Sequence, residues 1–117
     1  MTDISIFDTR PIIVVIGGPN GAGKSTFYAA HLAATGLRFV NADFLAHEME
    51  LSPYRAAGLA DALRRQLVQA RESFIMETVF SDPNGDKLGF LREAKQSGYH
   101  VVLCYIGLPR WLLNNSA

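Results

Sequence analysis

A glycine-rich loop near the N-terminus carries the strongest chemical signal in the sequence. It reads Gly18-Pro19-Asn20-Gly21-Ala22-Gly23-Lys24-Ser25-Thr26 and matches the Walker A pattern G-x-x-x-x-G-K-[ST]. Glycines let successive backbone N–H groups turn inward towards phosphate oxygens. Lys24 has the reach and charge to contact β- and γ-phosphates, and the Ser25 hydroxyl can bind the Mg²⁺ that bridges them. The loop therefore predicts a site for ATP and Mg²⁺.

Two acidic residues stand where a phosphoryl acceptor would need them. Asp43 follows the second predicted strand and Glu77 lies near the end of the third. Ligands of open α/β sheets bind at the carboxyl ends of strands, and transfer to a hydroxyl needs a carboxylate that takes its proton. Asp43 suits that role, although it also suits an N-cap for a helix over residues 44–50. Glu77 interrupts an apolar strand at a cost in free energy, which is consistent with Mg²⁺ binding through water, with substrate hydroxyls or with a structural bond to a loop.

The elements that would position these residues alternate along the chain. Residues 11–16 form a continuous β-branched run, typical of a strand buried in a parallel sheet, and lead into the loop. A helix over residues 25–34, ended by Gly36, and a second strand over residues 37–40 follow. Ser52 and Pro53 indicate the N-cap and first residue of the next helix.

The second half of the chain repeats this alternation. One apolar stripe has helical spacing and comprises Ala56, Leu59, Ala60, Leu63, Leu67 and Ala70, with Arg64, Arg65, Gln69 and Arg71 on the other faces. A strand over residues 73–79, a turn over 81–85, a stripe of Leu88, Leu91 and Ala94 closed by Gly98, and a strand over 99–106 complete the order. We predict a three-layer α/β core of the P-loop NTPase kind, with a mostly parallel sheet of about four strands, in one domain over residues 1–117.

Composition limits the function classes. The 117 residues carry 11 basic and 11 acidic side chains, and 49% are hydrophobic, which fits one globular domain and excludes a disordered chain. Balanced charge argues against sequence-independent nucleic-acid binding, which needs surplus positive charge. The single cysteine, Cys104, lies in an apolar run and allows no internal disulfide. Without a signal-peptide pattern or an apolar run of about 20 residues, we expect a cytoplasmic protein with no membrane partner.

Several motifs together resemble the zeta toxin-like P-loop kinases, especially short bacterial proteins often labelled predicted ABC-type ATPases. Besides the loop, they are Phe39-Val40-Asn41-Ala42-Asp43, Leu51-Ser52-Pro53, Ser73-Phe74-Ile75-Met76-Glu77-Thr78 and Gly98-Tyr99-His100-Val101. The resemblance runs from about Ile12 to Leu108. The loop alone is shared by many nucleotide-binding proteins, whereas Asn-Ala-Asp followed by Phe-x-x-Glu-Thr is much more specific.

The resemblance implies a kinase that phosphorylates a hydroxyl of UDP-N-acetylglucosamine or a related sugar nucleotide and is neutralised by an antitoxin protein. At matching positions, Lys24 is the phosphate-binding lysine, Ser25 the Mg²⁺ ligand and Asp43 the catalytic base. Glu77, with Thr78 beside it, matches the strand-end acid near the substrate. The strand order of this class, 2-3-1-4-5, would place the strand of Glu77 beside the strand that enters the loop.

The sequence departs from the family after the fourth predicted strand. Family members continue with a helix, a lid that carries arginines and a fifth strand, whereas residues 107–117 contain Arg110 alone. We therefore expect a core truncated at its C-terminus, with slower transfer and with an exposed sheet edge that favours self-association. The alternative is a nucleotide-binding remnant or interaction module without turnover. A switch or transport ATPase is disfavoured, because no Leu-Ser-Gly-Gly signature is present and no acid ends the run 101–106.

Overall fold

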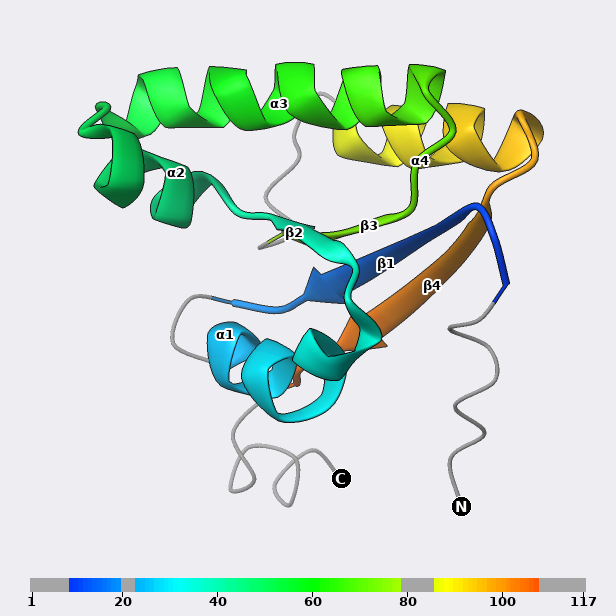
Figure 1. Ribbon diagram of the computed structural model, residues 1–117, viewed down its shortest axis with the longest axis horizontal. Coiled ribbons are helices and arrows are strands. Elements are labelled where there is room, and N and C mark those ends of the chain that lie inside the picture. The colour runs from blue at the N-terminus through cyan, green and yellow to red at the C-terminus, as the bar shows by residue number, and fades with distance from the viewer. Residues whose placement is uncertain (1–8, 20–22, 79–85, 108–117) are drawn as a thin grey trace, which may run out of the picture.

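A four-stranded parallel sheet forms the centre of the computed structural model, which describes residues 9–19, 23–78 and 86–107 (Figure 1). The strands are β1 (Ile12–Gly17), β2 (Arg38–Val40), β3 (Phe74–Thr78) and β4 (His100–Tyr105). Their order is β2-β3-β1-β4, and every neighbouring pair is parallel. The predicted sheet is confirmed, and β3 lies beside β1 as the resemblance implied. The predicted turn over residues 81–85 and Arg110 lie outside the described residues.

Helices cover both faces of the sheet, which gives the predicted three layers (Figure 1). α3 (Pro53–Gln69) and α4 (Asp86–Gln96) lie over one face, and α2 (Ala42–Met49) packs beside α3. α1 (Lys24–Phe27) and its continuation lie over the other face. Because β1 is buried along its whole length, its alternating side chains contribute to both layers of the core.

The predicted helix over residues 25–34 is confirmed in extent but is α-helical only in its first turn. After α1 the chain widens into a π-helical segment, η2 (Tyr28–Leu32), and then tightens into a 3₁₀ turn, η3 (Ala33–Thr35). The widened segment stacks Tyr28 on Phe39 of β2, with ring centroids 4.2 Å apart, and buries Leu32 under the sheet. Gly36 ends the segment with a positive φ of 73°, as its position after the helix predicts.

The core face of α3 differs from the predicted stripe at three residues: Leu59 and Ala70 were expected in the stripe but are exposed, and Arg64 is buried. Arg64 was expected on another face but is only 8% exposed, because it follows Ala60 by four residues and precedes Leu67 by three. Its guanidinium lies 3.5 Å from the Asp61 carboxylate, and burial lowers the pKa of Arg64. Aliphatic spacing alone misses a long cationic side chain that runs along the core.

The stripe predicted on α4 is also shifted. Leu88 is 58% exposed, whereas Phe90 is 8% and Ala94 1% exposed. Phe90 and Ala94 are four residues apart and therefore share the face towards the sheet. Leu91, which was predicted in the stripe, packs beside them.

Candidate functional site

The loop begins directly where β1 ends. The Gly18 N–H donates to the Thr78 carbonyl oxygen at 3.1 Å, which joins the loop entry to the end of β3. A side chain at Gly18 would meet the carbonyl oxygen of Ile106, and its φ of 150° also disfavours other residues. This glycine is therefore required by close backbone packing at the strand ends, in addition to any role with phosphates. Asn20, Gly21 and Ala22 lie outside the described residues, so their contacts with phosphate stay predictions.

Lys24 is buried and folded back onto the loop entry. Only 7% of it is exposed, and its Nζ donates to the Gly18 carbonyl oxygen at 2.7 Å and to that of Pro19 at 3.1 Å. An ammonium has three N–H donors, so these carbonyls hold it in place and leave one donor for an oxygen of a ligand. The arrangement fits a lysine that is positioned before a phosphate arrives.

The hydroxyls at the start of α1 are open to a ligand. Gly23 precedes α1 with a positive φ of 94°, and Ser25 and Thr26 are both exposed. Mg²⁺ usually keeps several waters and takes one or two protein oxygens together with substrate phosphates. Exposed Ser25 can supply one such protein oxygen. Among the described residues, His, Cys, Asp and Glu form no cluster of three that would hold a metal by itself.

Glu77 lies next to the last residues of β1. In the parallel register Ile16 pairs with Glu77 and Gly17 with Thr78. Burial is the largest effect on the Glu77 carboxyl and raises its pKa; the nearby Lys24 ammonium lowers the pKa and the Asp43 carboxylate raises it. Thr78 is buried, and alternation along β3 places its side chain on the opposite face from Glu77. The two residues predicted to bind substrate together therefore point to different layers.

Asp43 lies in the first turn of α2 but does not cap that helix. Asn41 is the N-cap, and its Oδ1 accepts hydrogen bonds from the Asp43 N–H at 2.8 Å and the Phe44 N–H at 3.2 Å. The alternative interpretation of Asp43 as the cap is therefore wrong, because the helix starts at Ala42. Asparagine is as good a cap as aspartate, so sequence could have identified Asn41. With the cap supplied by Asn41, the exposed Asp43 carboxylate is available for chemistry.

Three charged residues thus lie towards the carboxyl ends of three neighbouring strands. Lys24 follows β1, Asp43 follows β2 and Glu77 lies in β3, and the last of these senses the charges of the other two. A cation and two carboxylates beside a glycine-rich loop can bind phosphate, hold Mg²⁺ and accept a proton. The sequence predicted all three residues, and the fold brings them together.

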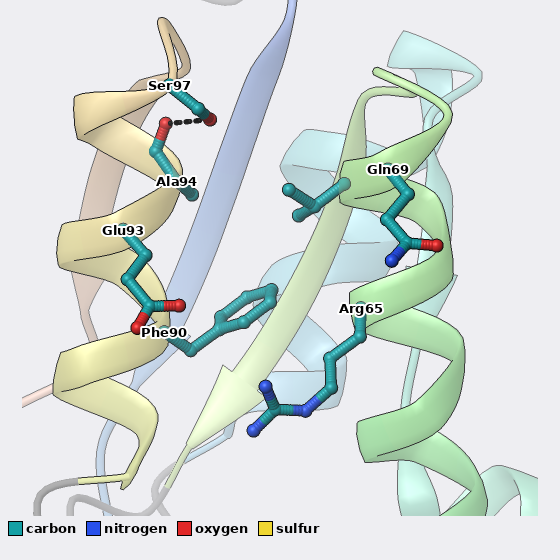
Figure 2. Close-up of a pocket in the computed structure, with 7 residues that line it drawn as sticks. Arg65, Gln69, Phe90, Glu93, Ala94 and Ser97 are labelled. Carbon is teal, nitrogen blue, oxygen red and sulfur yellow. Dashed lines mark hydrogen bonds between the residues drawn. The ribbon is translucent and has the colours of Figure 1, made fainter.

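A separate groove lies between α3 and α4 (Figure 2). Its walls come from Arg65 and Gln69 on one helix and from Phe90 and Glu93 on the other, and it shares no residue with the loop. The Arg65 side chain already donates to Asp61 of its own helix at 3.1 Å. This groove is therefore not part of the candidate site.

Comparison with known proteins supports the fold. No protein-family model and no curated protein matches the sequence. A solved structure described as a "putative kinase" from Chloroflexus aurantiacus aligns with a TM-score of 0.62 and 16% sequence identity. The alignment covers 83% of this chain and 58% of that chain, so the present chain spans less than two thirds of its structural neighbour. At this identity the likeness shows a shared kinase-like fold.

Helix length and polarity bear on a membrane location. Within residues 9–19, 23–78 and 86–107, no helix combines the length and apolar character needed to cross a membrane.

Proposed function

We propose that the chain binds ATP with Mg²⁺ at the loop Gly18–Thr26 and transfers the γ-phosphoryl group to a hydroxyl of a small molecule. The observation that carries this proposal is the convergence of Lys24, Asp43 and Glu77 at the carboxyl edge of the sheet. Phosphoryl transfer asks the protein for positioning and charge neutralisation more than for covalent chemistry, and these groups suit both tasks.

Each residue has a distinct role in this proposal. Lys24 neutralises the β- and γ-phosphates, and Ser25 with Glu77 holds Mg²⁺, which offsets charge on the phosphate oxygens. Asp43 orients the acceptor hydroxyl and takes its proton as the new P–O bond forms. The support is the exposure of Asp43 and Ser25 and the hydrogen bond from the Lys24 Nζ to the Gly18 carbonyl oxygen at the loop entry.

The acceptor follows from the zeta toxin-like motifs. We propose a UDP-amino sugar such as UDP-N-acetylglucosamine, on the strength of Asn41-Ala42-Asp43 and Phe74-Ile75-Met76-Glu77-Thr78. The same resemblance suggests an antitoxin protein as partner. For a chain that spans 58% of its structural neighbour, substrate and partner both remain proposals for the whole protein.

A second candidate function is nucleotide binding without turnover. Among the described residues, Lys24 is the one cation whose charge acts on Glu77. Efficient phosphoryl transfer commonly uses an additional arginine, which is worth about 10³–10⁵ in rate. This distribution of charge favours a binding module if residues outside the described ranges supply no further cation.

The test measures binding and transfer separately on the full chain. Calorimetry with ATP and Mg²⁺ gives affinity, and γ-labelled ATP with a panel of sugar nucleotides gives transfer. We expect Lys24→Met to abolish binding, and Asp43→Asn to keep binding while slowing transfer about 100-fold or more. Glu48→Gln, an exposed acid of the same helix α2, is the control and leaves both unchanged. Binding without label transfer by the unmodified chain supports the second candidate, and absence of ATP binding rejects both.

A further inference from the structure

We propose that the edge of the sheet opposite the loop carries a second anion-binding site, formed around Arg38 and Arg71 and suited to a small phosphorylated molecule. Because all strands are parallel, their amino ends gather at one edge, away from the carboxyl ends that form the candidate active site. A surface pocket of about 440 Å³ lies at this edge. That volume falls within the range of about 300–1,000 Å³ for small-molecule sites.

The pocket is lined by residues at or just before the first residues of three adjacent strands. β1, β2 and β3 begin at Ile12, Arg38 and Phe74. The lining includes Arg10, Gly36, Arg38, Arg71, Glu72 and Ser73. Arginine residues thus line the pocket from separate segments of the chain, brought together by the topology and not by sequence spacing.

Arg71 is held in position by the fold. Its backbone has a positive φ of 58° just after α3, and its Nη1 donates to the Ser97 carbonyl oxygen at 2.8 Å. Its guanidinium carbon also lies 5.6 Å from the centre of the Tyr99 ring. Ordering a long side chain on binding costs free energy, so a guanidinium already fixed by these contacts binds an anion at lower cost.

Arginine residues outnumber acidic residues in the lining of the pocket, where Glu72 is the acid. Arg38 is exposed at the start of β2. The ion pairs found within 4.0 Å among the described residues join Asp61 to Arg64 and to Arg65, so Glu72 pairs with neither Arg38 nor Arg71. Two arginines that form no ion pair with the nearby Glu72 carboxylate favour an anionic ligand.

The donors match a phosphate group better than a lone carboxylate. Guanidinium forks bind phosphate oxygens in a bidentate manner, and two of them can engage a dianion from different sides. The Ser73 Oγ accepts from the Ile12 N–H at 2.9 Å, which leaves its own hydroxyl hydrogen to donate. A nucleic-acid backbone is disfavoured as the ligand, because the chain as a whole has 11 basic and 11 acidic residues.

The test is a titration of the full isotope-labelled chain with inorganic phosphate, followed by NMR of backbone amides. We expect saturable shifts at Leu37, Arg38 and Ser73. Phosphate that binds the glycine-rich loop shifts the amides of Gly23 and Ser25, so the two sites are read independently. The second site therefore stands or falls separately from the proposed kinase function.

Two variants make the result decisive. Arg38→Ala, at an exposed position, weakens phosphate binding at the pocket about tenfold or more, which is the loss expected for a charge-assisted pair. Arg92→Ala removes an exposed arginine of α4 that does not line the pocket, and it leaves the affinity unchanged. Unsaturable pocket shifts, an unchanged affinity in Arg38→Ala, or an equal loss in both variants would overturn the proposal. Tighter binding of an oligonucleotide than of phosphate would overturn the choice of a small ligand.

Discussion

Glu77 places a carboxylate where the surrounding protein disfavours its charge. Burial and Asp43 raise its pKa from the ordinary value of 4.5 more than Lys24 lowers it. Between 4.5 and the raised value, the folded chain binds more protons than the unfolded chain, so stability falls as pH rises through that window. A group kept ionised at a cost in stability is typical of a functional position.

The prediction is that Glu77→Gln stabilises the fold near neutral pH. The gain is less than about 1 kcal/mol, because Glu77 is only half-buried and solvent screens its charge. Urea unfolding at about pH 7 and about pH 4 measures it, and the gain disappears at the lower pH. Glu48→Gln, at an exposed position, shows no such difference. Equal stability of Glu77→Gln and the parent chain at neutral pH contradicts the prediction.

Asn41 positions Asp43 through the helix cap. Asn41→Ala removes acceptors for two N–H groups of the first turn of α2 and is expected to cost about 1 kcal/mol of unfolding free energy. We also expect slower phosphoryl transfer, because the first turn of α2, which carries Asp43, is no longer held by its cap. Ser52→Ala, which removes the cap of α3, costs similar stability but spares transfer. The comparison uses denaturant unfolding and the labelled-ATP assay; an equal effect of both variants on transfer refutes the positioning role.

Single residues were predictable where spacing defines the chemistry. The loop, Asp43 and Glu77 were predicted from a motif and from strand ends, and the structure places Lys24, Asp43 and Glu77 at one edge of the sheet, while their roles stay predictions. Spacing did not separate Asn41 from Asp43 as the cap, because both types cap helices and they are two residues apart. Nor did it show that Thr78 faces away from Glu77, although strand alternation carries that signal.

At the scale of elements, the turns after α3 and α4 are locked together. Arg71, just after α3, contacts the Ser97 carbonyl beside Gly98. The Tyr99 hydroxyl donates to the Glu72 carbonyl oxygen at 2.8 Å and lies 3.2 Å from that of Leu67. These contacts fix where β3 and β4 begin. They therefore also fix where the carboxyl ends of the two strands lie relative to the glycine-rich loop.

A pair of glycine variants tests this coupling. Gly98 has a φ of 107°, and an added Cβ would lie 3.0 Å from the Arg71 Nη2. Gly98→Ala should therefore cost about 1–3 kcal/mol. Gly58 lies inside α3 with no atom within 4 Å of an added Cβ, so Gly58→Ala should gain about 0.5–1 kcal/mol. Chemical denaturation gives the sign of the change in unfolding free energy for both variants. A Gly98→Ala variant that is more stable than the parent chain would contradict the coupling between the two turns.

The periodicity of apolar residues predicted which helices and strands form better than it predicted which side chains each of them buries. Every strand and helix predicted within the described residues exists, because apolar runs and helix caps are local signals. Arg64 and Leu88 were placed on the wrong faces, since burial depends on what packs opposite each helix. The switch to π-helical bonding at Tyr28 depends on contacts with the sheet and has no local signal.

At the scale of the whole molecule, the described part of the sheet ends in a strand with exposed apolar side chains. β4 is an outer strand of the described sheet, and Leu103 and Tyr105 are 56% and 53% exposed on the same face of it. An outer strand that exposes apolar side chains is a template for pairing with another strand. Because the net charge is zero, long-range repulsion between copies is weak.

We therefore predict that copies of this chain associate through β4. Leu103→Lys should weaken self-association about tenfold or more, because a lysine at a strand edge opposes pairing. Leu88→Lys is the matched control, since Leu88 is 58% exposed and belongs to α4 and not to the strand. Sedimentation velocity across a range of concentrations measures both variants. Association that survives Leu103→Lys, or that Leu88→Lys disrupts equally, assigns the contact to another surface.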